Sequence, residues 1–228
     1  MPDSGTPTER AGRRSTASTE AIVQDMRERI ASRLIQPGAR IQEEAVSSDY
    51  DVPRAKAREA LAVLEDRGLV ERIPNKGATA CIIDMETTHA LYEVREALDG
   101  LAVRLAIQNS RPEDWTELAA LMGEPFERSL ASGDIETHIA IIERFRSHLT
   151  AMARNPVLAD MLERLYDRTR TTMRRVALLP GRAQTGMGQY RQVLDAILRG
   201  DADGAELAFR QLNRSARDFM ARYKDYVI

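Results

Sequence analysis

The segment that most constrains the fold of this chain is residues 51–68, which read DVPRAKAREALAVLEDRG. Its apolar side chains recur at the three- and four-residue spacing of one helical face: Ala57, Ala60, Leu61 and Leu64. Gly68 follows the last of them and can end a helix in the left-handed conformation. The pattern therefore predicts an amphipathic helix that buries one face against a core.

Another face of this helix is basic, and a hairpin pattern follows it. Arg54 and Arg58 are four residues apart, so they lie on one side near the helix start. Residues 69–74 and 78–83 are short runs on either side of residues 75–77 (NKG), whose Asn and Gly tolerate positive φ. A helix with exposed arginines, followed by a hairpin with a basic tip, is suited to reading the DNA major groove while the hairpin contacts the backbone.

Three motifs here resemble the winged helix-turn-helix of GntR-family transcriptional regulators: VPRAKAREAL at 52–61, LEDRGLV at 64–70 and PNKGA at 74–78. The family usually has VSRTPVREAL at the first motif. This chain departs from it at Pro53, Ala55, Lys56 and Ala57 but keeps both arginines and REAL. The resemblance implies double-stranded DNA as a partner. The positions that it places at the DNA are Arg54, Ala55, Lys56, Arg58, Lys76 and Gly77.

The bulk composition sets limits on this interpretation. The 228 residues favour two domains, and 43% hydrophobic with 30% charged residues is typical of a soluble globular protein. Because the net charge is only -2, any DNA footprint must come from local placement of charge. The single cysteine, Cys81, excludes an intramolecular disulfide and fits a reducing cytoplasm. No apolar run approaches the roughly 20 residues of a membrane span, so we expect a cytoplasmic protein without a membrane partner.

We expect three segments along the chain. Residues 1–17 have little to bury and predict a disordered tail. Residues 18–83 form the DNA-binding domain, with helices near 19–34 and 43–50 before the recognition helix and a short strand at residues 40–42. Residues 84–228 have helical patterns only. Their six expected helices lie near 86–108, 110–130, 134–153, 155–179, up to 200, and 201–223.

The second half resembles the effector-binding domain of the FadR-type (FCD) branch of the same family. The likeness lies in LYEVREAL at 91–98, in residues 145–149 followed by Asn155-Pro156, and in AILRGD at 196–201. It implies a mainly α fold, a winged helix-turn-helix followed by an all-α six-helix bundle. Six helices favour the VanR-like subgroup over the seven-helix FadR type. The resemblance also implies a homodimer on a palindromic operator and a small effector, an organic acid.

Many members of this branch hold a metal ion with an Asp-x-x-x-His pair and two further histidines. The aligned positions in this chain are Ile142, Arg146, Tyr190 and either Leu212 or Asn213. Apart from a weak candidate in the asparagine, none of these side chains is a metal ligand, and an arginine repels a cation. We therefore expect no metal cofactor. The remaining histidines, with His138 on the face of Arg146 and His148 facing solvent, are expected to be ordinary polar or partly buried side chains.

A carboxylate on the effector is the partner that a buried Arg146 would need, because a guanidinium offers a fork matched to an anion. The candidate effector-binding set is Arg95, Ile142, Arg146, Tyr190 and Asn213. Two alternatives stay open. Arg95 can instead pair internally with Glu143 or Asp99, and Arg146 can point outward or pair with a helix carboxylate.

An enzyme is not expected. Residues 86–89 (ETTH) have the spacing of a di-iron bundle, but no second copy accompanies them. The chain has no glycine-rich phosphate loop, nucleophile elbow or Cys/His cluster. We therefore predict a homodimeric, one-component repressor. The alternative is a DNA-binding regulator whose helical domain only dimerises and senses no ligand.

Overall fold

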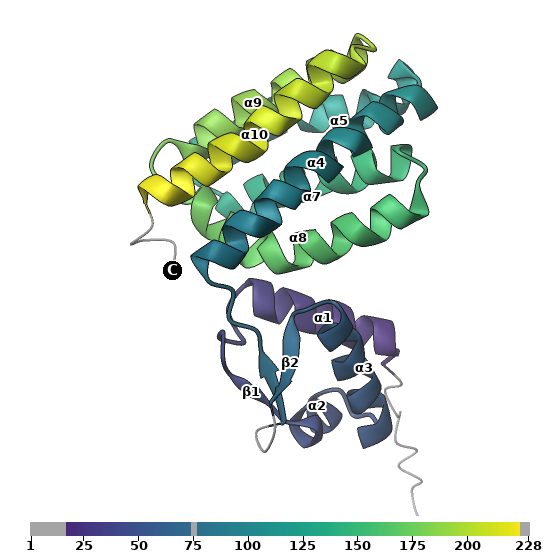
Figure 1. The fold of residues 1–228 in the computed structure, drawn as a ribbon, viewed down its shortest axis with the longest axis vertical. Helices are drawn as coiled ribbons and strands as arrows, with labels where there is room; N and C mark the ends of the chain where they lie inside the picture. Colours follow the sequence, from purple (N-terminus) through teal and green to yellow (C-terminus); the bar gives the residue numbers. More distant parts are fainter. Residues whose placement is uncertain (1–16, 74–76, 224–228) are drawn as a thin grey trace, which may run out of the picture. The chain divides into compact units, whose positions relative to one another are not determined.

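The structure, a computed structural model, describes residues 17–73 and 77–223 (Figure 1). The chain divides into two compact units, one of residues up to Ile30 with Leu34–Cys81, the other of Ala31–Arg33 with the chain from Ile82. Within the described residues, the first holds a small sheet and three helices, and the second is helical. The predicted fold class, a mainly α chain with a winged helix-turn-helix before a helical domain, is confirmed. The predicted tail and the hairpin tip with Lys76 lie outside the described residues.

The first unit is a winged helix-turn-helix. Its elements are α1 (Thr19–Ala31), β1 (Arg40–Ile41), α2 (Glu43–Asp49), α3 (Arg54–Asp66), β2 (Val70–Ile73) and β3 (Gly77–Ala80). The strands form an antiparallel sheet in the order β1-β3-β2. Between α2 and α3 the chain turns at Asp51, whose φ of 50° is one that aspartate tolerates better than most residues. The Ser47 hydroxyl fastens this turn by donating to the carbonyl of Val52 at 2.5 Å.

The core of this unit is built on the helical face that the sequence predicts. The apolar stripe of α3 is buried, with exposed fractions of 1% or less at Ala57, Ala60, Leu61 and Leu64. It packs in one hydrophobic cluster with Ile22 and Met26 of α1 and with Val70 of β2. The opposite side of α3 is left at the surface, so the fold presents the arginine-bearing face outward.

The second unit is a helical bundle. Its elements are α4 (Met85–Asn109), a 3-10 turn (Pro112–Trp115), α5 (Thr116–Leu121), α6 (Glu124–Ala131), α7 (Ile135–Met152), α8 (Pro156–Ala177), α9 (Arg182–Leu198) and α10 (Ala202–Arg222). Figure 1 shows α4 and α10 side by side. Side-chain oxygens cap the first turns of four helices, because helix starts leave backbone N–H groups without partners. The capping residues are Asp84, Asp134, Asn155 and Asp201.

The helix predicted near 110–130 is interrupted. It divides into α5 and α6 at Gly123, because Pro125 near the start of α6 has no N–H to continue the ladder. Arg191 of α9 fills the break by donating to the carbonyls of Met122 and Gly123, each at 2.9 Å. The assignment to the VanR-like subgroup, which depends on a helix count, stays a prediction.

Candidate functional site

The arginines of α3 are exposed and are paired with the preceding helix. The side chains of Arg54 and Arg58 are 64% and 65% exposed. Arg58 holds Glu43 with two guanidinium nitrogens, the shorter contact joining Nη2 to Oε2 at 3.0 Å. Arg54 forms an ion pair with Glu44. In the free protein, therefore, both predicted DNA-contacting arginines are neutralised by glutamates of α2.

A third arginine joins this cluster from the wing. Arg72 of β2 donates to Glu65 of α3 at 2.9 Å and lies 3.6 Å from the carboxylate of Glu43. Hydrogen bonds from Arg58, together with the charge of Arg72, hold the pKa of Glu43 below its ordinary value. Glu43 therefore stays ionised at neutral pH and links α3 to β2 of the wing.

The other predicted DNA positions are placed differently. Ala55 is exposed on α3 beside Arg54. The Lys56 ammonium donates to the carbonyl of Ala17 at 3.2 Å, so this side chain reaches the start of α1. Gly77 begins β3 with a φ of 79°, a value that favours glycine. Lys76 lies outside the described residues.

Inside the helical unit lies a small cavity of about 30 Å³. It brings together three predicted effector positions, Ile142 and Arg146 from one face of α7 and Tyr190 from α9. Leu212 of α10 also lines it, whereas Asn213 does not. Four of the aligned positions thus line one space.

Arg146 is buried, with 6% of its surface exposed, so the alternative in which it points outward does not hold. Its guanidinium carbon lies 5.0 Å from the ring centre of Tyr166, and its Nη1 is 2.9 Å from the sulfur of Met173. Burial disfavours its charge, but the electrostatic influence of Tyr190, Tyr166 and Asp99 leaves its pKa above the ordinary value. Among the described residues, neither its Nε nor the Tyr190 hydroxyl has a hydrogen-bond partner.

A second arginine in the cavity was not predicted. Arg182, the first residue of α9, is 7% exposed and donates to Gln189 at 3.2 Å. A Cβ on Gly186 would lie 3.2 Å from its Nη1, so the missing side chain leaves room for the guanidinium to lie along its own helix. Burial lowers the pKa of Arg182, yet an arginine remains protonated at neutral pH.

Arg95 and Asn213, which were predicted to bind the effector, are not among the residues that line this cavity. The carboxylate of Asp99 is 3.5 Å from Arg95, and Asn213 donates to it at 2.9 Å. Tyr166 donates to the same carboxylate. The predicted internal pairing of Arg95 with Asp99 is therefore confirmed, whereas Glu143 pairs with Arg170. This network buries one negative charge beside the cavity and fixes Tyr166 under Arg146.

His138 and His148 were both expected to be ordinary polar or partly buried side chains, and the structure places them in different surroundings. His138 lines the cavity, stacks on Phe126 with ring centres 4.5 Å apart, and lies 3.3 Å from the Ser129 hydroxyl. Desolvation, with a smaller contribution from the charge of Arg182, lowers its pKa. His148 was expected to face solvent, but it packs edge-on against Trp115 at 4.9 Å. In residues 17–73 and 77–223 no group of three or more His, Cys, Asp or Glu side chains could hold a metal ion.

Comparison with known proteins decides the family. The family described as "Bacterial regulatory proteins, gntR family" matches residues 18–79, and "FCD domain" matches residues 90–215. The chain belongs to the GntR family. It is a DNA-binding transcriptional regulator with an FCD domain, and its matching relatives are regulators, not enzymes.

Individual relatives are similar in sequence to most of this chain. "HTH-type transcriptional regulator McbR" from Escherichia coli (strain K12) is 24% identical over 82% of this chain and 85% of that protein. "HTH-type transcriptional repressor RspR" from the same organism is 22% identical over 91% of this chain and 92% of that protein. The solved structure of E. coli McbR/YncC has a TM-score of 0.78 at 22% identity and covers 91% of this chain and 98% of that chain.

Proposed function

We propose that this GntR-family regulator is a homodimeric repressor acting in the cytoplasm, which binds a near-palindromic operator and responds to an organic acid. The observation that carries the effector is the cavity between α7, α9 and α10. Two arginines line it, and no aspartate or glutamate does among the described residues. A buried charge without a counter-ion is costly, so an anion is the ligand that this lining favours.

The free donors of the cavity support a carboxylate. The Arg146 Nε and the Tyr190 hydroxyl are both buried without partners, and leaving such groups unsatisfied costs free energy. Arginine forms paired hydrogen bonds with a carboxylate, and a tyrosine hydroxyl can add a third. Arg146 stands where metal-binding relatives hold an ion, and its fixed charge can neutralise an acid in the same place.

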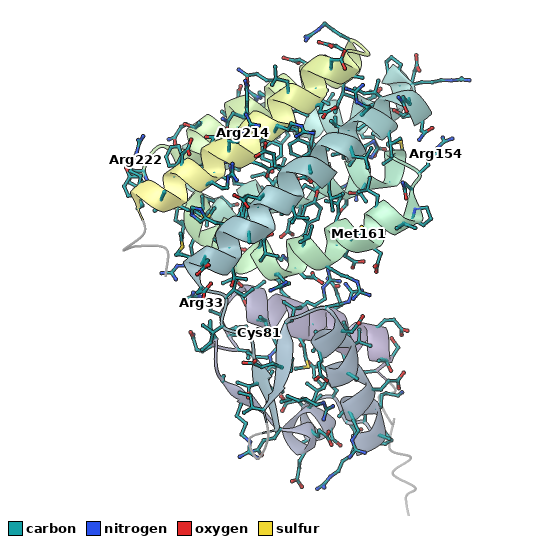
Figure 2. The ribbon with its side chains drawn as sticks, in the orientation of Figure 1. Arg33, Cys81, Arg154, Met161, Arg214 and Arg222 are labelled. Atoms are coloured by element: carbon teal, nitrogen blue, oxygen red, sulfur yellow. The ribbon has the colours of Figure 1, made fainter. Side chains whose placement is uncertain are left out.

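The helical domain also offers a surface for a second copy. Ala90, Val94, Ala97 and Leu101 lie at spacings of four, three and four residues on α4 and are all exposed. Val94 and Leu101, the larger side chains of this stripe, are 49% and 42% exposed. Met161, labelled on α8 in Figure 2, is exposed to 49%. A stripe of this spacing packs well against its own symmetry copy.

The repressor role rests on weaker support, the printed name of one relative, "HTH-type transcriptional repressor RspR". The competing function is a DNA-binding regulator whose helical domain dimerises and binds no ligand. The buried cations of the cavity favour a sensor, since a domain that only dimerises has no need of two arginines facing one internal space.

Ligand-induced stabilisation separates these two functions. A ligand that binds only the folded state raises the melting temperature by mass action, so a panel of carboxylic and sugar acids is screened against the full-length protein. At least one acid should raise the melting temperature by several degrees in wild type and not in Arg146→Ala. Arg144→Ala, an exposed arginine on the same helix, is the matched control and should keep the shift. If no acid stabilises the wild type, the domain is not an acid sensor.

A further inference from the structure

A larger groove adjoins the cavity in the helical unit. This groove has a volume of about 260 Å³ and lies between the end of α6, the start of α7 and the connection from α8 to α9. Three residues line both spaces: His138, Ala177 and Ala183. Two of the three are alanines, so His138 has the largest side chain of the three residues at this junction, which we call the neck. The two spaces therefore adjoin at these three residues.

The two spaces differ sharply in chemistry. The inner one is cationic, with Arg146 and Arg182, while the groove has no Asp, Glu, Lys or Arg among its described lining residues. Its walls are mainly apolar, with Leu130, Ile135 and Leu179 contributing. A charged group is thus favoured at the inner end and an uncharged one at the outer end.

The neck itself is neutral. The Ser129 hydroxyl donates its one proton to the carbonyl of Phe126 at 2.7 Å, so it can only accept from the nearby Nδ1 of His138. The imidazole is also stacked face to face on Phe126. Burial lowers the pKa of His138, so its ring is uncharged at neutral pH. An uncharged aromatic neck passes an apolar chain and offers no competing cation to an acid group.

The volumes of the cavity and the groove fit a ligand with a small acid group at one end and a larger uncharged body. About 30 Å³ accommodates roughly two water-sized groups, which matches the two oxygens of one carboxylate and leaves no room for a second acid group. Together, the volumes of the cavity and the groove approach the lower end of the range for small-molecule sites, about 300 Å³. The body of the ligand must therefore lie outside the inner cavity.

We propose that the effector is an amphipathic monocarboxylic acid, whose carboxylate lies between Arg146 and Arg182 and whose uncharged, mainly apolar body passes His138 into the groove. The inference rests on the proposed acid sensing and adds the shape and charge distribution of the acid. Burying each methylene of the body should tighten binding by about fourfold.

A matched ligand series on the full-length protein tests this. The Kd values of acetate, hexanoate, adipate and hexanamide are measured by calorimetry. Hexanoate should bind at least tenfold more tightly than acetate, because its chain enters the groove. Adipate, which places a second charge in the neutral groove, should lose that gain, and hexanamide should not bind. Adipate binding as tightly as hexanoate would overturn the proposal.

A variant at the neck locates the effect. Ala177→Leu adds a side chain where cavity and groove meet, so it should abolish the advantage of hexanoate and keep acetate binding. Ala159→Leu is the control, since Ala159 is equally half-buried on α8 and lines neither space. If acetate and hexanoate bind wild type equally and only through Arg146, the groove proposal fails and acid sensing stands. If no acid binds at all, acid sensing fails as well.

Discussion

At the residue scale, two arginines, Arg58 and Arg146, lie in opposite environments. The guanidinium of Arg58 is exposed and paired with Glu43, so it can exchange that partner for a base edge at little desolvation cost. The guanidinium of Arg146 is buried over Tyr166 and keeps an unpaired Nε. The surface arginine thus has an exposed partner, whereas the buried one keeps a donor without a partner among the described residues.

Arg58→Ala should weaken operator binding by about one to two orders of magnitude and relax base preference, if Arg58 reads a guanine edge. Lys76→Ala should instead weaken binding to all DNA sequences alike. It should also reduce the slope of log K against log salt concentration by about one. Fluorescence anisotropy with operator and scrambled duplexes measures both. Unchanged operator affinity and selectivity in Arg58→Ala would show that α3 is not the recognition helix.

Sequence reasoning found part of the cavity and missed part of it. Ile142, Arg146 and Tyr190 were predicted together, because a family motif fixes their spacing along α7 and their place on α9. Arg182 was not predicted, since its position depends on the space above Gly186 and on where α9 begins. No periodicity signals either condition. Asn213 was placed in the lining by a one-residue slip, which on a helix turns a side chain by about 100°.

At the element scale, caps and apolar stripes were predictable, and breaks were less so. The capping oxygens of Asp134, Asn155 and Asp201 are local features, so the sequence reveals them directly. Gly123 and Pro125 are local signals for the break that the expected helix over residues 110–130 did not take into account. The hydrogen bonds from Arg191 to the two freed carbonyls come from a distant helix and have no local signature.

The exposed stripe of α4 gives a prediction for assembly. Leu101→Glu should convert the proposed full-length dimer to a monomer at micromolar concentration, because a two-fold interface would bury two like charges close together. Light scattering coupled to size exclusion measures the mass. Leu34→Glu, at an apolar side chain that is 77% exposed in the other part of the chain, is the control and should stay dimeric. A dimeric Leu101→Glu protein would exclude this stripe as the interface.

At the scale of the whole molecule, the proposed regulation is a coupling between two ligands. An acid that favours one arrangement of the DNA-binding domains changes operator affinity by the ratio of its affinities for the two arrangements. The operator must change the affinity for the acid by the same factor. In the proposed regulation, one buried arginine, Arg146, binds the acid without taking part in DNA binding.

The most direct measurement is the operator Kd of wild type and Arg146→Ala, each with and without the stabilising acid and with and without chelator. The account predicts that the acid changes the wild-type Kd by at least fivefold, with or without chelator. Arg146→Ala should bind the operator within about twofold of wild type, with a Kd that the acid leaves unchanged. An acid response in Arg146→Ala equal to that of wild type, or a wild-type response abolished by chelator, would contradict the account.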